Sequence, residues 1–209
     1  MNRWAVFVEG LEDLKDFDQL GEGARLDLVR TINKTTARFR TRGADQIRQA
    51  INFPASYLQP GQKRLYVAQQ ATRSKPEGII RARGRATSLA RFVTGRSPGK
   101  EGVTVQVKKG HSEHLKRAFL VKLPAGTGSV DTQFNMGLAV RLRKGDTLRN
   151  KRTAKRLARG LYLLYGPSVD QVFINATGAR AGQGVASDMS DDILDFMQKE
   201  FLRLWELRF

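Results

Sequence analysis

The chain has two histidines, His111 and His114, which are three residues apart with Glu113 between them. This His-x-x-His spacing is typical of metal sites where a helix presents both rings on one face and a third or fourth ligand completes the shell. The segment from Gly110 to His114 reads as a loop, and the sequence indicates no further ligand nearby. We therefore expect a solvated turn here, and no metal or other cofactor.

Other catalytic arrangements are equally weak. Ser168 follows Gly166 and Pro167, which is not the G-x-S-x-G nucleophile elbow. Hydrolysis of phosphodiesters ordinarily needs clustered carboxylates, and the basic region offers scattered ones such as Asp131 and Asp146. These patterns favour a protein that is not an enzyme. A nuclease stays open only if magnesium-dependent cleavage depends on a carboxylate such as Asp131.

The strongest signal is the distribution of charge. The formal net charge is +17 over 209 residues. Residues 60–160 hold 24 Lys or Arg and five acids, a net charge of +19, and the two flanks together are at −2. Positive charges at such a density repel one another and destabilise the fold unless a polyanion neutralises them, and phosphate backbones are the commonest polyanion. No motif for reading bases is present, so we expect phosphate contacts that are insensitive to sequence.

Several elements could position these charges. The run from Gly78 to Ala86 alternates small or apolar residues with Arg81, Arg83 and Arg85, which predicts a strand with three arginines on one face. Further strands are predicted at residues 3–8, 103–107, 118–123 and 137–142, and a strand or turn at 162–165 and 169–174. The basic stretch from Asn150 to Arg159 has too few apolar residues for a packed face and predicts an exposed, mobile loop.

Helical periodicity marks the two ends of the chain. A short helix is predicted over residues 11–20, and a longer one runs from Ala24 to Ile51, with Gly43 as a weak point. Its exposed face is predicted to carry Arg25, Asn33, Arg40 and Arg48. A glycine-rich hinge at about 178–187 leads to a last amphipathic helix, which buries Ile193, Met197, Phe201, Leu204 and Trp205, with N-caps offered by Ser187, Asp188 and Ser190.

Together these patterns predict an α+β fold in a single domain over residues 1–209. A mostly antiparallel sheet is packed by the long helix in the N-terminal half and by the C-terminal amphipathic helix, with extended basic loops, one at about 144–160. The 40% apolar content is enough for a real core. We expect neither a secretory signal nor a membrane span, because no apolar stretch approaches the roughly 20 residues that a span requires.

The order of these parts resembles the minor tail protein Z family of long-tailed bacteriophages, also described as tail completion proteins. The most specific match is the turn Tyr165-Gly166-Pro167-Ser168, followed by Asp170 and Phe173. The early long helix, the basic strand near Ile79 to Arg85, the segment at 117–119 and the terminal helix follow in the expected order.

This resemblance implies a structural virion protein that forms a ring at the head-proximal end of the tail and helps the tail join a filled head. Its partners would be further copies of itself in a hexameric ring, the tail terminator, tail tube or head-tail connector proteins, and the phage DNA. It would occupy the tail or neck of the virion, and the host cytoplasm during assembly.

A ring subunit with a basic face could line the channel through which the genome passes. The residues expected to face the channel are Arg81, Arg83, Arg85, Arg141, Arg143, Lys144, Arg149, Lys151, Arg152, Lys155 and Arg156. Alternatively, the loop from Arg149 to Arg159 orders against an acidic neighbouring ring. The rival from another class is a sequence-independent nucleic-acid-binding protein of the ribosomal or nucleoid type.

Overall fold

The structure is a computed structural model that describes residues 21–95, 102–124, 135–143, 145, 147–148, 154–157, 160–174 and 184–208, and the backbone of residues 3–6. It divides into two compact units. The first comprises the described residues within Met1–Ile47, Ser56–Gly84 and Val169–Phe209, and the second those within Arg48–Ala55 and Arg85–Ser168. Because both units are assembled from separate stretches of chain, the single domain over 1–209 stays a prediction.

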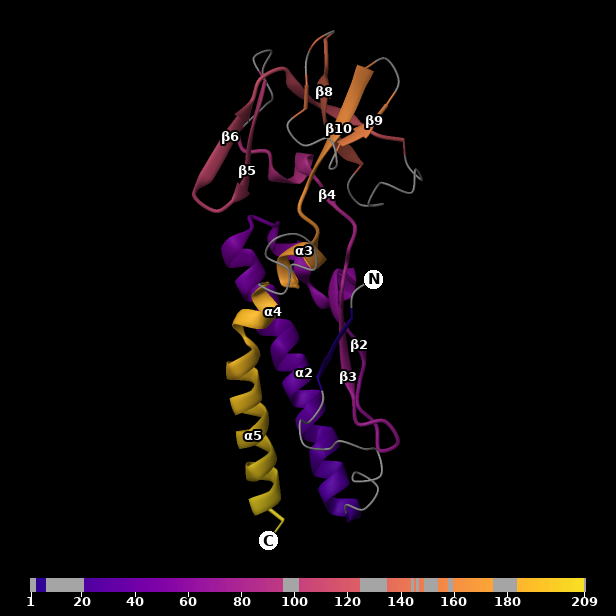
Figure 1. The fold of residues 1–209 in the computed structure, drawn as a ribbon, viewed down its shortest axis with the longest axis vertical. Coiled ribbons are helices and arrows are strands. Elements are labelled where there is room, and N and C mark those ends of the chain that lie inside the picture. The colour runs from indigo at the N-terminus through magenta and orange to yellow at the C-terminus, as the bar shows by residue number, and fades with distance from the viewer. Residues whose placement is uncertain are drawn as a thin grey trace. The chain divides into compact units, whose positions relative to one another are not determined.

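The predicted α+β class is confirmed. The described chain combines a long helix in its N-terminal half and a C-terminal helix with strands that all pair antiparallel (Figure 1). The predicted short helix at 11–20 and most of the hinge, residues 178–183, lie outside the described residues.

The first unit is built on helix α2 (Glu22–Ala50). Its buried side chains, among them Leu28, Ile32, Phe39 and Ile47, recur at the predicted helical spacing. The helix runs unbroken through Gly43, where a Cβ atom would lie 2.7 Å from Cε2 of Phe173. The lack of a side chain at Gly43 therefore lets an aromatic ring pack closely against α2, and the helix does not break there.

A three-stranded sheet in the same unit has the order β1 (Arg3–Val6), β3 (Gly78–Ala82), β2 (Leu65–Gln69). Two short turns of 3₁₀ helix, η1 (Ala55–Leu58) and η2 (Pro60–Gln62), precede β2. Polar side chains of α2 hold this region: Asn33 exchanges two hydrogen bonds with the backbone of Ala71, and Arg40 donates to the carbonyls of Leu58 and Leu65. The prediction that Asn33 and Arg40 belong to an exposed face is therefore wrong.

Three further helices belong to the described part of the first unit. Helix α3 (Val169–Phe173) replaces the predicted strand or turn, and α4 (Val185–Asp188) leads into α5 (Ser190–Glu206). Of the predicted stripe, Ile193 and Met197 are buried, whereas Trp205 is 38% exposed. The N-cap position of α5 is Met189, which has no capping side chain, and Ser190 instead donates from Oγ to the carbonyl of Ser187.

The second unit is mostly sheet. Strand β10 (Leu161–Gly166) is flanked on one side by β8 (Met136–Arg141), which pairs in turn with β7 (Ala118–Lys122). On its other side lie β9 (Ala154–Arg156) and β4 (Thr87–Ser88), and the 3₁₀ helix η3 (Leu89–Phe92) follows β4. A separate hairpin joins β5 (Val103–Lys108) to β6 (His111–Leu115).

Candidate nucleic-acid interface

The two units differ sharply in charge. The described residues of the second unit contain one acid, Glu113, and twelve basic residues: Arg48, Arg85, Arg91, Lys108, Lys109, Lys116, Arg117, Lys122, Arg141, Arg143, Lys155 and Arg156. The described part of the first unit is more balanced, with 16 basic and 11 acidic residues. The excess charge seen in the sequence therefore belongs mainly to one structural unit.

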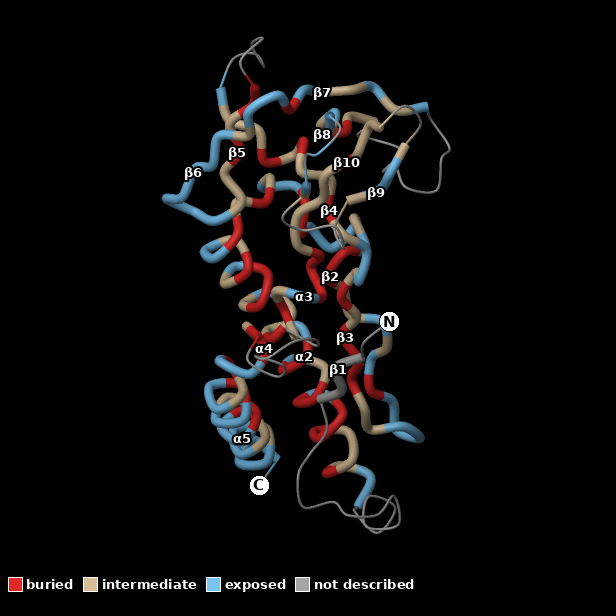
Figure 2. The backbone as a smooth tube through the Cα atoms, turned by 45° about the horizontal axis from the view of Figure 1, so that its top comes forward, coloured by how far each residue is buried: buried red, intermediate tan, exposed pale blue. Residues whose placement is uncertain are grey.

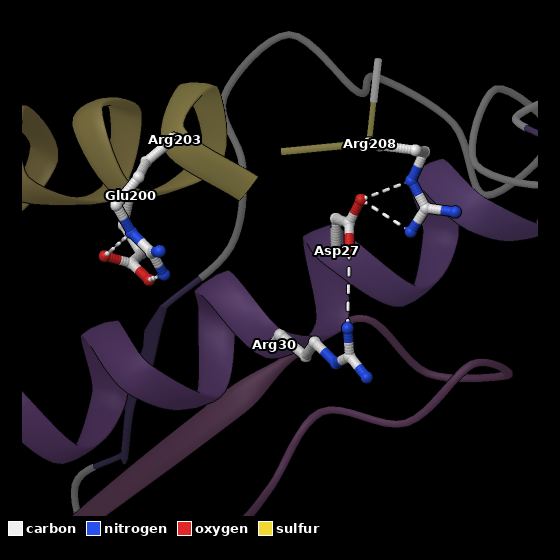
Figure 3. A network of polar contacts seen from close by, with 5 residues as sticks. All are labelled: Asp27, Arg30, Glu200, Arg203 and Arg208. Carbon is white, nitrogen blue, oxygen red and sulfur yellow. Dashed lines mark hydrogen bonds and ion pairs between the residues drawn. The ribbon is translucent and has the colours of Figure 1, made fainter. Parts of the chain in front are cut away.

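Acids of the first unit hold its own helices together (Figure 3). Asp27, near the start of α2, accepts from Arg208 at the end of α5, and Glu200 of α5 pairs with Lys34 at 2.8 Å and with Arg203 at 2.6 Å. Further along, Arg42 lies 3.1 Å from Asp192. As the residue number rises along α2, the number of the partner in or just after α5 falls. The two helices therefore form an antiparallel pair that is joined by ion pairs at three positions along its length.

Two buried acids of this unit, Glu200 and Asp170, have shifted pKa values. Hydrogen bonds from Arg203 and Lys34 lower the pKa of Glu200 to about 2, despite the opposing effect of burial. Burial raises the pKa of Asp170. The Glu200 carboxylate therefore stays charged at every physiological pH and serves the helix pair.

The three arginines that were predicted to share one face of a strand do not all lie on a strand. Strand β3 ends at Ala82, so only Arg81 lies on it, and there it is half-buried. The backbone of Arg83 is held in a loop, where its N–H donates to Arg64 and its carbonyl accepts from the N–H of Asp170. Arg85 is exposed and belongs to the second unit. Alternation of small and basic residues predicted one strand from Gly78 to Ala86, but β3 ends at Ala82, and the bond from Arg83 to Arg64 only extends the register in which Leu65 pairs with Ala82.

The other predicted cations that the structure describes gather around strand β10. Arg141 ends β8 opposite Leu161, and Lys155 lies on β9 opposite Leu163. Since paired residues and alternate residues share a face, Arg141 and Lys155 project from the same face, on either side of β10. Arg156, opposite Tyr162, projects from the other face. These side chains and Arg143 are all exposed.

Part of the predicted mobile loop is a strand. Ala154, Lys155 and Arg156 pair with β10, and Gly160, at φ +69°, directly precedes that strand. The N–H of Leu157 also donates to the carbonyl of Leu161, at 2.7 Å. A strand of three residues, two of which are exposed cations, is too short to show in the sequence the alternation of apolar and polar residues that marks a strand. Lys144, Arg149, Lys151 and Arg152 lie outside the described residues.

The turn that carries the family resemblance is the connection from β10 to α3. Tyr165 and Gly166 still belong to β10 and pair with Ser88 and Thr87, whereas Pro167 and the buried Ser168 lead into the helix. A Cβ atom at Gly166 would lie 3.0 Å from Cε2 of Phe92. Close packing at this glycine gives the residue a structural role.

Sequence reasoning missed the hairpin of β5 and β6. The segment from Gly110 to His114 was expected to be a loop, but residues 111–115 form a strand in which His111, Ser112, Glu113 and His114 are all exposed (Figure 2). Uniform exposure leaves no hydrophobic period, so the only available signal was the alternation in β5 followed by Lys109-Gly110. Because His111 and His114 are three residues apart, the strand turns them to opposite faces.

The described residues contain no group of three or more His, Asp or Glu side chains that could hold a metal ion. Within the same residues, no helix combines the length and the apolar character that crossing a membrane requires.

Comparisons with known proteins add no relative: no family model, curated protein or solved structure matches this chain. The function of the chain therefore has to be inferred from its own residues.

Proposed function

We propose that this chain is a structural, non-enzymatic virion protein that forms a ring at the head-proximal end of a long phage tail and aids head-tail joining. The observation that carries the proposal is the separation of charge, with twelve basic residues and one acid among the described residues of the second unit. A ring subunit needs one part that packs and another that faces what passes through the lumen, and a genome in transit is a polyanion.

The first unit supports the packing role. The buried acids of its helix pair, Asp27 and Glu200, form ion pairs with basic residues of the same unit. These contacts stabilise the helix pair without a polyanion. The second unit supports the lumenal role, because Arg141, Lys155 and Arg156 are exposed on strands that fix them in space. Six-fold symmetry and the adjoining terminator, tube or connector proteins come from the family resemblance alone.

Two partners fit the basic unit within this assembly. The first is the DNA itself, contacted through phosphates, and the second is an acidic face of a neighbouring ring. A sequence-independent nucleic-acid-binding protein of the ribosomal or nucleoid type would carry a similar charge but need not form a closed ring. Assembly state therefore separates the leading proposal from its rival.

The test is native mass spectrometry of the purified chain, alone and with linear DNA duplexes of two lengths. We expect a closed oligomer of one defined stoichiometry that is the same with either duplex. A monomer whose bound copy number rises in proportion to duplex length would contradict the ring and support the rival protein class.

A further inference from the structure

The hairpin of β5 and β6 is the most completely exposed basic element among the described residues of the second unit. Lys108 and Lys109 lie at its tip, where Gly110 adopts φ +73°, and Lys116 and Arg117 follow the far end of β6. These four residues and the side chains from His111 to His114 are exposed. The hairpin therefore carries a basic pair at each end of one strand.

The hairpin is anchored to the rest of the second unit through its inner strand, β5. Val103 and Val105 of β5 are buried, and the edge of β5 that faces away from β6 is held by backbone bonds from Asn52 to Val107, at 2.8 Å, and from Thr94 to Thr104, at 3.0 Å. In the part of the chain that the structure describes, no further strand pairs with β6, which forms the outer strand of the hairpin (Figure 2). An anchored inner strand and an exposed outer strand hold the cations in place before any ligand binds, which lowers the entropy cost of binding.

The spacing of the two basic pairs fits duplex DNA. Strand β6 has five residues, and at about 3.3 Å per residue they span about 16 Å. The major groove of B-form DNA is about 12 Å wide and admits a two-stranded β-ribbon. Basic pairs at the two ends of β6 can therefore reach the phosphate backbones on both sides of one groove.

We propose that the β5–β6 hairpin is the principal contact of the second unit with the phosphate backbone of double-stranded DNA, with Lys108, Lys109 and Lys116 as phosphate ligands. This inference deepens the proposed function and depends on its claim that the basic unit faces DNA. It assigns the leading contact to residues outside the set Arg141, Lys155 and Arg156. Glu113, midway along β6, is the one acid among the described residues of the second unit, and its negative charge opposes phosphate binding.

The experiment measures fluorescence anisotropy of a labelled duplex of about 24 base pairs, a little over two helical turns, across a salt series with the full chain. Three proteins are compared: the unaltered chain, K108Q/K109Q/K116Q, and the matched variant R141Q/K155Q/R156Q, which also loses three positive charges. We expect the hairpin variant to bind at least tenfold more weakly, and its log-log salt slope to fall by about 3. We expect the strand variant, which removes cations that the proposed function also turns toward the DNA, to weaken binding as well, but by a smaller factor than the hairpin variant.

A second variant keeps the proposal testable if the triple variant folds poorly. Glu113→Gln removes the acid and should tighten DNA binding, whereas the exposed substitution Glu206→Gln on α5 should leave binding unchanged.

Equal losses in the two triple variants, or no gain from Glu113→Gln, would overturn the hairpin assignment and leave the proposed function intact. If the unaltered chain shows no salt-dependent DNA binding, the DNA-facing role fails together with the hairpin. Tighter binding to poly-glutamate than to DNA would overturn the hairpin assignment in favour of an acidic protein partner.

Discussion

Asp27 and Arg208 are 181 residues apart in the chain, and their side chains form an ion pair with an Nη2–Oδ2 distance of 2.7 Å. The Asp27 side chain is only 3% exposed, and it also lies 3.7 Å from Arg30, whose side chain is 59% exposed. The pair joins the beginning of α2 to the residues just after α5 (Figure 3).

This geometry predicts unequal effects for the two arginines that contact Asp27. Arg208→Ala removes the closer partner of a buried carboxylate, and we expect a loss of about 1–3 kcal/mol in the free energy of unfolding. Arg30→Ala removes an exposed partner and should cost less than about 1 kcal/mol. Urea unfolding followed by circular dichroism measures both. Equal losses for the two variants would contradict the larger contribution assigned to Arg208.

The low pKa of Glu200 predicts how stability depends on acid. The folded-state pKa is about 2 and the ordinary value is 4.5, so the contribution is fully present above pH 4.5 and is lost as pH falls toward 2. We expect Glu200→Gln to lower stability near neutral pH and to flatten its decline between those values.

Asp195→Asn is the control for this acid dependence. Asp195 pairs with Lys199 on the exposed surface of α5, where its side chain is 59% exposed. The control should keep the decline of the unaltered protein, as measured by urea midpoints at pH 6 and pH 3. A decline in Glu200→Gln as steep as in the unaltered protein would contradict the role of this carboxylate.

Gly43 offers a test of packing between α2 and α3. Alanine is the better helix former by about 1 kcal/mol, but its Cβ would lie 2.7 Å from the Phe173 ring, and overpacking costs about 1–3 kcal/mol. We expect Gly43→Ala to destabilise the protein, and to be neutral or stabilising when Phe173 is replaced by Leu. A double-mutant cycle of unfolding free energies measures this coupling. Additive effects would show that the ring does not exclude a side chain at position 43.

The sequence predicts the fold class because the long helix and the inner strands bury apolar residues with a clear period. It fails where side chains are uniformly exposed, as in β6, or where a strand is only three residues long, as in β9. It also fails for Asn33 and Arg40, because hydrogen bonds from a side chain to a distant backbone carbonyl leave no mark on hydrophobic periodicity.

The candidate site was predictable only in part. Composition alone located the basic region, and the strands around β10 bring Arg141, Lys155 and Arg156 into one sheet. Arg81 and Arg83 lie instead in the more balanced first unit. Long-range pairing decides which cations share a unit, and no local pattern records it.

The most direct test of the central claim is electron cryomicroscopy of phage particles assembled with and without this chain. We predict a closed ring at the head-proximal end of the tail that is present only with the chain, with Arg141 and Lys155 facing the lumen. Particles in which the chain forms no ring, or a ring in which these residues face away from the lumen, would contradict it.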